Sequence, residues 1–193
     1  VLDVDYLTIW VKTPVHKGFY TIYDEEFNSN DIWNDPRWTR SGTYYYVNET
    51  AGYLHKSYAG TNEDYVQYNI VLSLPVILEV RGVLWSDGLD YTSPSLSFTL
   101  SNGSTYSVVY NTNGDNWRLL NKYISSPYGP QNEGDWYTYR VVLYEDKALL
   151  YSRPKDDLDW DLAAQLNTSL ANAHIVNVQL YGSWDPVMDI DYL

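Results

Sequence analysis

Acidic side chains form three clusters that could supply a catalytic carboxylate pair. They are Asp24-Glu25-Glu26, then Asp156, Asp157 and Asp159, and finally Asp185, Asp189 and Asp191. Cleavage of a glycosidic bond needs one carboxylic acid to protonate the leaving oxygen and a second carboxylate to act as nucleophile or base. A polysaccharide-cleaving enzyme is therefore one hypothesis for this chain.

Asp189 and Asp191 are the pair whose spacing most restricts their chemistry. Residues two apart in a strand project from the same face, so these carboxylates would lie side by side in the final segment. Two such charges repel unless a proton or a cation lies between them. Since Ca²⁺ prefers carboxylate and carbonyl oxygens, we expect a structural Ca²⁺ site here. The alternative is a solvated acidic edge strand, which protects a sheet edge from aggregation.

Other common catalytic groups are missing from the sequence. The chain has no Cys, and its three His, at positions 16, 55 and 174, show no metal-binding spacing. There is also no Gly-x-Ser-x-Gly motif, no phosphate-binding Gly loop and no dinucleotide-binding fingerprint. These absences remove the usual anchors of thiol, serine-hydrolase and nucleotide chemistry.

Several Trp residues are placed beside polar residues in a way that suits sugar recognition. A sugar ring has an apolar face of C–H groups and a rim of hydroxyls, so it needs an aromatic platform beside hydrogen-bonding groups. The predicted ligand-binding residues are Trp38, Trp85, Asp87, Trp117, Asn121 and Trp184. The alternative for each Trp is a place in the core.

The aromatic composition also suggests rings that serve recognition. The chain has 21 Tyr and 8 Trp but only 3 Phe. Because Phe fills a core as well as Tyr does, the preference for Tyr indicates rings with one face in apolar packing and a hydroxyl at a wet surface or a partner. A thin sandwich with many half-buried strand positions is the alternative explanation.

Charge and hydrophobicity restrict the partners. The formal net charge is −13, and the 12 Lys and Arg are scattered, so we expect no nucleic-acid partner. No apolar run approaches the about 18 residues of a membrane span, so we expect no membrane insertion. The absence of Cys favours a reducing compartment, whereas abundant Tyr, Asn, Ser and Thr favour an extracellular protein at a cell or virion surface, which is the location that we expect. The start at Val1 suggests a piece of a larger protein whose other domains it assembles with, and residues 1–17 suggest a connecting strand from a preceding domain.

Short β-rich runs bounded by Gly, Pro, Asn and Asp recur along the whole chain. Asn102-Gly103 and Asn113-Gly114 are typical of tight hairpin turns. Only Leu158 to Ala173 has helical spacing, with Leu162, Leu166 and Leu170 four residues apart. The sequence therefore predicts one all-β domain over residues 1–193, a two-sheet antiparallel jelly-roll β-sandwich with one short helix.

Three stretches resemble the concanavalin A-like lectin/glucanase superfamily, which includes laminin-G-like modules. The first is Phe27-Asn28 through Trp33 to Gly42-Thr43-Tyr44-Tyr45-Tyr46 and Gly52-Tyr53-Leu54; the second is Gly134 to Leu143 with the hairpin Tyr144-Glu145-Asp146-Lys147; the third is Met188 to Leu193. The glucanase branch carries a Glu-x-Asp-x-x-Glu strand with its nucleophile and acid, and this sequence has no such string. The resemblance therefore implies a non-catalytic sandwich.

What the resemblance implies about function is a carbohydrate-binding or attachment domain of a larger cell-surface or virion-spike protein. Its expected partner is a glycan or a surface glycoprotein. Because a fold does not determine a function, two alternatives stay open: a structural domain of a surface layer, pilus or virion, and a diverged polysaccharide-cleaving enzyme.

Overall fold

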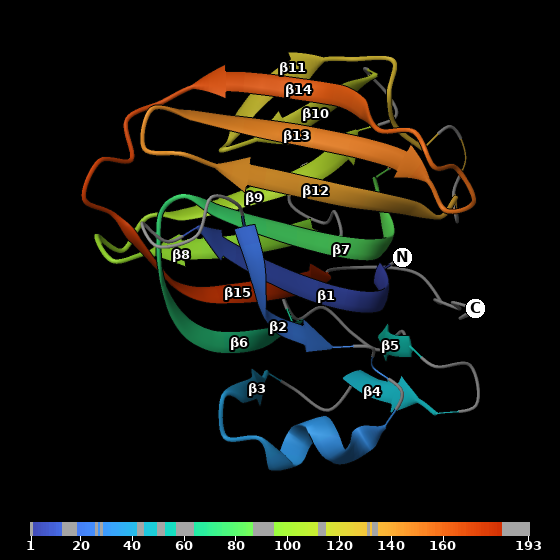
Figure 1. Ribbon diagram of the computed structural model, residues 1–193. Helices are drawn as coiled ribbons and strands as arrows, with labels where there is room; N and C mark the ends of the chain where they lie inside the picture. Colours follow the sequence, from blue (N-terminus) through green and yellow to red (C-terminus); the bar gives the residue numbers. More distant parts are fainter. Residues whose placement is uncertain are drawn as a thin grey trace.

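Two antiparallel β-sheets pack face to face in this protein (Figure 1). The computed structural model describes residues 2–12, 19–25, 27, 29–41, 45–49, 53–56, 64–86, 95–111, 115–130, 132 and 135–182. The predicted all-β class, a two-sheet antiparallel sandwich, is confirmed. No helix in these ranges is long and apolar enough to cross a membrane.

The first sheet contains the strands that form the candidate site. Its central strands lie in the order β14 (Asp161–Asn167), β13 (Lys147–Pro154), β12 (Tyr137–Leu143), β7 (Val76–Ser86) and β1 (Leu2–Lys12). Beyond β1 lie β2 (Phe19–Glu25) and β5 (Tyr53–Lys56), and β4 (Tyr45–Asn48) pairs with β5. Part of segment 1–17 is thus a strand paired along most of its length with β7.

The second sheet closes the other side of the core. Its order is β11 (Lys122–Ser125), β10 (Asn116–Leu119), β9 (Thr105–Asn111), β8 (Ser95–Leu100), β15 (His174–Gly182), β6 (Asp64–Ser73) and β3 (Trp38–Arg40). A short parallel pairing of β7 with β9, through Trp85 and Tyr110, links the two sheets.

Strand alternation fills the space between the sheets. In β7 the side chains of Val76, Leu78 and Val80 are buried in the core, and the intervening residues face outward. The inner face of the second sheet adds large rings, of which Tyr110 and Trp117 are fully buried. Several aromatic side chains therefore belong to the core, where they are fully buried rather than half-buried.

Two hairpins match the sequence-based expectation. The turn at Asn102-Gly103 joins β8 to β9, with Gly103 at φ 84° and its N–H donating to the Leu100 carbonyl (2.9 Å). A second hairpin joins β12 to β13, and the Tyr144 N–H donates to the Lys147 carbonyl (2.8 Å). Asn113 and Gly114 lie outside the described residues.

The helix predicted for Leu158 to Ala173 is wrong. Residues 161–167 form β14, which pairs antiparallel with β13. The helical element among the described residues is a 3₁₀ turn, η1 (Asn30–Asn34). The Asp157 carboxylate accepts the Asp159 N–H (3.1 Å) and so stabilises a turn before β14.

Candidate functional site

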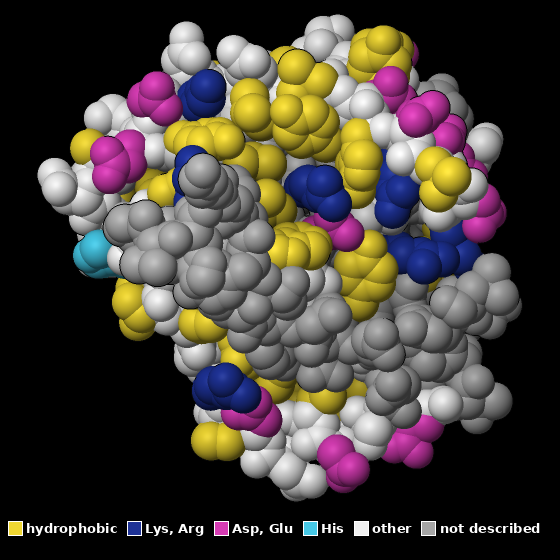
Figure 2. All heavy atoms as spheres, viewed as in Figure 1, with side chains coloured by type: hydrophobic (Ala, Val, Ile, Leu, Met, Phe, Trp, Pro, Cys, Tyr) yellow, Lys and Arg dark blue, Asp and Glu magenta, His cyan; other side chains and the backbone are white. Residues whose placement is uncertain are grey.

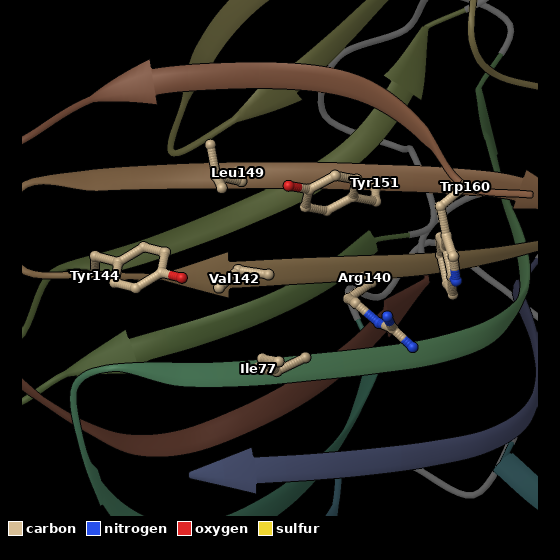
Figure 3. A pocket seen from close by; sticks show the side chains of 7 residues that line it. All are labelled: Ile77, Arg140, Val142, Tyr144, Leu149, Tyr151 and Trp160. Carbon is tan, nitrogen blue, oxygen red and sulfur yellow. The ribbon is translucent and has the colours of Figure 1, made fainter. Parts of the chain in front are cut away.

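A hollow lies on the outer face of the first sheet, across β7, β12 and β13 (Figure 3). Its volume is about 290 Å³, and its lining side chains are Ile77, Arg140, Val142, Tyr144, Leu149, Tyr151 and Trp160. Strand alternation exposes this set, because Tyr139, Val141 and Leu143 of β12 point into the core and turn Arg140 and Val142 outward.

The floor of the hollow is aliphatic. Val142 lies opposite Ile77 of β7 on one side and opposite Leu149 of β13 on the other. These three side chains form one row across three strands, and Val142 at its centre is 6% exposed. An apolar floor of this kind can accept a ligand's C–H surface.

Two tyrosine hydroxyls face this floor. Figure 3 shows the hydroxyl oxygen of Tyr144 directed toward Val142 and that of Tyr151 directed toward Leu149. Within the described part of the chain, neither hydroxyl makes a hydrogen bond. A phenolic hydroxyl both donates and accepts, so each can bind a ligand hydroxyl.

Arg140 and Glu79 form an ion pair at one end of the hollow. The register places them opposite each other on β12 and β7, and Nε and Nη2 of Arg140 both lie 2.6 Å from Oε2 of Glu79. The other carboxylate oxygen, Oε1, accepts the hydroxyl of Tyr6 (2.8 Å). Burial, and then the Glu79 charge, raise the pKa of Tyr6 well above its ordinary value, so this hydroxyl stays protonated and donating.

Trp160 forms the wall beside Arg140. The guanidinium carbon of Arg140 lies 4.2 Å from the Trp160 ring centre and 5.6 Å from that of Trp10 on β1. The guanidinium carbon of Arg153 lies 4.6 Å from the Trp160 ring centre. In Figure 2, hydrophobic side chains gather over β12, β13 and β14 with basic side chains among them.

The prediction that Trp38 and Trp117 present exposed rings to a ligand is wrong. Trp38 is 5% exposed and packs against Phe27 and Tyr68, at 5.7 and 5.1 Å between ring centres. Trp117 is fully buried, and its Nε1–H donates to the Tyr128 carbonyl (2.7 Å). Both rings start from strand positions that alternation turns inward, so neither offers a sugar a free face.

The other predicted ligand residues do not join the hollow. Asn121 is exposed, but its side chain donates to the Thr105 carbonyl (3.1 Å) and accepts from Ser107 (3.3 Å), so it stabilises the turn between β10 and β11. Trp85 lies in β7, where the structure describes its backbone alone. Asp87 and Trp184 lie outside the described residues.

The expected Ca²⁺ ligands Asp189 and Asp191 also lie outside the described residues. Within the ranges that the structure describes, no group of three or more His, Asp or Glu side chains could hold a metal ion.

The outer face of the second sheet is polar but largely paired with itself. Gln179 donates to Gln67 (2.6 Å), Gln67 donates to Asn69 (2.5 Å), and Asn69 donates to the Arg37 carbonyl (3.0 Å). These amides satisfy one another, whereas the tyrosine hydroxyls of the hollow do not. The hollow is the better candidate for ligand binding.

The hollow was missed because its residues come from separate segments. One signal could have found part of it: the hairpin at Tyr144–Lys147 fixes the register that puts Arg140 opposite Tyr151 and Val142 opposite Leu149. Nothing in the sequence indicates that Glu79 lies beside Arg140, 61 residues later.

Comparison of the chain with protein-family models and with curated proteins gives no match.

Proposed function

We propose that this protein is a non-catalytic carbohydrate-binding module whose sugar site is the hollow of the first sheet. The observation that carries the proposal is an apolar floor, Ile77, Val142 and Leu149, faced by the two unengaged hydroxyls of Tyr144 and Tyr151. A sugar presents the matching surfaces, with C–H groups for the floor and hydroxyls for the rim.

The dimensions support a small ligand unit. Small-molecule sites usually have volumes of about 300–1,000 Å³, and this hollow, at about 290 Å³, is at the lower end. The hollow is also open on one side, so the rest of a longer glycan could continue into solvent. We therefore propose recognition of one or two sugar units of a glycan or surface glycoprotein.

The sequence is consistent with binding rather than cleavage. It resembles the concanavalin A-like superfamily but has no Glu-x-Asp-x-x-Glu strand of the glucanase branch. Among the residues that line the hollow there is no carboxylate, whereas cleavage of a glycosidic bond needs two. Attachment of a larger surface protein to glycans is the biological role that we propose for such a module.

A glycan array followed by calorimetric titration of the best ligand tests the proposal. The variants Tyr144→Ala and Tyr151→Ala should each weaken binding by about 1–3 kcal/mol, as expected for aromatic anchors. Tyr123→Ala is the matched control, because Tyr123 is 52% exposed on β11 of the other sheet. If the wild type binds no glycan, or if all three variants bind equally well, the proposal is wrong.

A further inference from the structure

Arg140 is held in one orientation by its neighbours. Glu79 engages the Nε and Nη2 side of the guanidinium at 2.6 Å. Glu79 is itself fixed, because its side chain is 7% exposed and its second oxygen accepts the Tyr6 hydroxyl. A charged group with so little freedom loses little conformational entropy when a ligand binds to it.

The aromatic wall adds to this preorganisation. Trp160 lies 4.2 Å from the guanidinium carbon of Arg140. Arg153 holds the segment that carries Trp160, since its Nη1 donates to the Asp157 carbonyl (2.9 Å). The plane of the Arg140 guanidinium is therefore set by contacts on its Glu79 side and with the Trp160 ring.

The opposite edge of Arg140 is available to a ligand. A guanidinium has five N–H donors, and Glu79 occupies two of them, on Nε and Nη2. Across the described ranges, Arg140 makes no other hydrogen bond. The remaining donors, on Nη1 and Nη2, form a fork on a side chain that is 33% exposed and lines the hollow. Such a fork matches the two oxygens of a carboxylate.

The charge of this face also favours an anion, although the protein as a whole is strongly acidic. On the outer face of β7, β12 and β13 the described basic side chains are Arg81, Arg140, Lys147 and Arg153, and the described acidic one is Glu79. On these three strands the described basic side chains therefore outnumber the acidic ones, although the exposed Asp157, Asp159 and Asp161 flank Trp160 and the net charge of the chain is −13. That excess can attract an anionic ligand.

We propose that the hollow selects sugars that carry a carboxylate, which binds in a bidentate manner to the Nη1 and Nη2 edge of Arg140. The sugar ring then lies over Val142, and its hydroxyls meet Tyr144 and Tyr151. This inference rests on the proposed carbohydrate-binding function and adds the chemical class of the sugar.

The test uses trimers of glucuronic, galacturonic and mannuronic acid and sialyllactose. Each acidic trimer is paired with its carboxyl-reduced neutral counterpart, and sialyllactose with lactose. Binding is measured by calorimetry or NMR titration on the full chain. The best acidic ligand should bind on the order of tenfold more tightly than its neutral partner, because charge-assisted hydrogen bonds are stronger than neutral ones.

Variants separate the fork geometry from simple charge. Arg140→Lys keeps the charge but loses the fork, so the ratio of acidic to neutral affinity should fall toward one. Arg140→Gln should do the same, and Lys122→Gln, on exposed β11 of the other sheet, controls for the loss of one positive charge. Near-UV circular dichroism checks that each variant folds.

The outcomes distinguish the two proposals. A preference for acidic sugars that Arg140→Lys abolishes and Lys122→Gln retains supports the inference. Neutral sugars that bind as tightly as acidic ones, or a preference that survives in Arg140→Lys, overturn the inference and leave carbohydrate binding intact. If neither the array nor the acidic panel yields a ligand, the proposed function itself is overturned.

Discussion

The guanidinium carbon of Arg140 lies 4.2 Å from the ring centre of Trp160, although Arg140 is in β12 and Trp160 follows β13. A cation over an indole ring contributes about 0.5–2 kcal/mol, more where water is excluded. The contact therefore joins a connecting segment to the centre of the sheet. It also gives the hollow a wall that the strands alone would not provide.

Replacing Trp160 with Ala should weaken sugar binding by about 1–3 kcal/mol, because the variant loses the wall and frees the Arg140 side chain. The free energy of unfolding should change by less than about 1 kcal/mol, since the ring is half-buried outside the strands. Calorimetric titration and urea denaturation measure the two effects. Trp136→Ala is the matched control, because Trp136 also has a cation nearby, Lys155, but does not line the hollow. Equal binding by both variants would contradict the role of Trp160.

Replacing Trp117 with Ala should have the opposite effect, with the large change in the free energy of unfolding rather than in sugar binding. Trp117 is fully buried between Tyr110 and Tyr139, at 5.0 and 5.3 Å between ring centres. We expect a loss of about 3–5 kcal/mol in the free energy of unfolding, which is the usual cost of a large cavity in the core. Urea denaturation measures it. A loss below about 1 kcal/mol would show that the ring is not part of the core.

The sequence predicted the sandwich because strand alternation is a local signal. It misassigned residues 158–173 for a physical reason: Leu162 and Leu166 are four apart, and a separation of four puts residues on one side of a helix and also on one side of a strand. The pairing of residues 161–167 with β13 decides between the two periods. That pairing depends on tertiary contacts, which the local pattern of the Leu residues does not contain.

The same limit applies to the site. Polar neighbours in sequence made Trp38 and Trp117 attractive ligand residues, but the neighbours of a strand residue point to the opposite face. The hairpin between β12 and β13 was expected from the sequence, and it places Arg140 opposite Tyr151. This pair could therefore have been predicted. Glu79 lies beside Arg140 because the chain leaves the first sheet after β7 and returns to it at β12. No local sequence pattern encodes that path.

Replacing Tyr6 with Phe should give a stability loss that depends on pH. At pH 7 the variant loses the hydrogen bond to the Glu79 carboxylate, at a cost of about 1.5–3 kcal/mol. In the wild type the pKa of Tyr6 is raised in the folded state, so above about pH 10 the unfolded chain releases this proton first. The unfolded state then binds fewer protons, and the stability that Tyr6 contributes falls as the pH rises.

The measurable consequence is a difference in the free energy of unfolding between the wild type and Tyr6→Phe, which becomes smaller as the pH rises. Urea denaturation of both proteins at pH 7, 9, 10 and 11 should show a constant difference up to about pH 9 and a smaller one at pH 11. Comparing the two proteins removes the titration of the other tyrosines. A difference that stays constant or grows between pH 9 and pH 11 would contradict a raised pKa for Tyr6.

Gly129 should tolerate no side chain, because it lies against a core ring. A Cβ atom at Gly129 would lie 2.6 Å from Cδ2 and Cζ of Tyr110. Tyr110 is fully buried against Trp117, so its ring has no room to move. Gly129→Ala should therefore lower the free energy of unfolding by about 1–3 kcal/mol through overpacking. Gly103→Ala is a useful comparison, since a Cβ there meets open space but the backbone has φ 84°, which costs about 1–2 kcal/mol of strain.

A double-mutant cycle separates these two mechanisms. If the Gly129→Ala loss comes from the Tyr110 ring, then combining it with Tyr110→Leu should cost less than the sum of the single losses, by at least about 0.5 kcal/mol. Combining Gly103→Ala with Tyr110→Leu should be additive, because the strain at Gly103 is local to the hairpin between β8 and β9. Urea denaturation of the wild type and these five variants gives both couplings. Additive losses for Gly129→Ala with Tyr110→Leu would mean that the ring moves aside and that the core near Gly129 is looser than the packing of Tyr110 and Trp117 indicates.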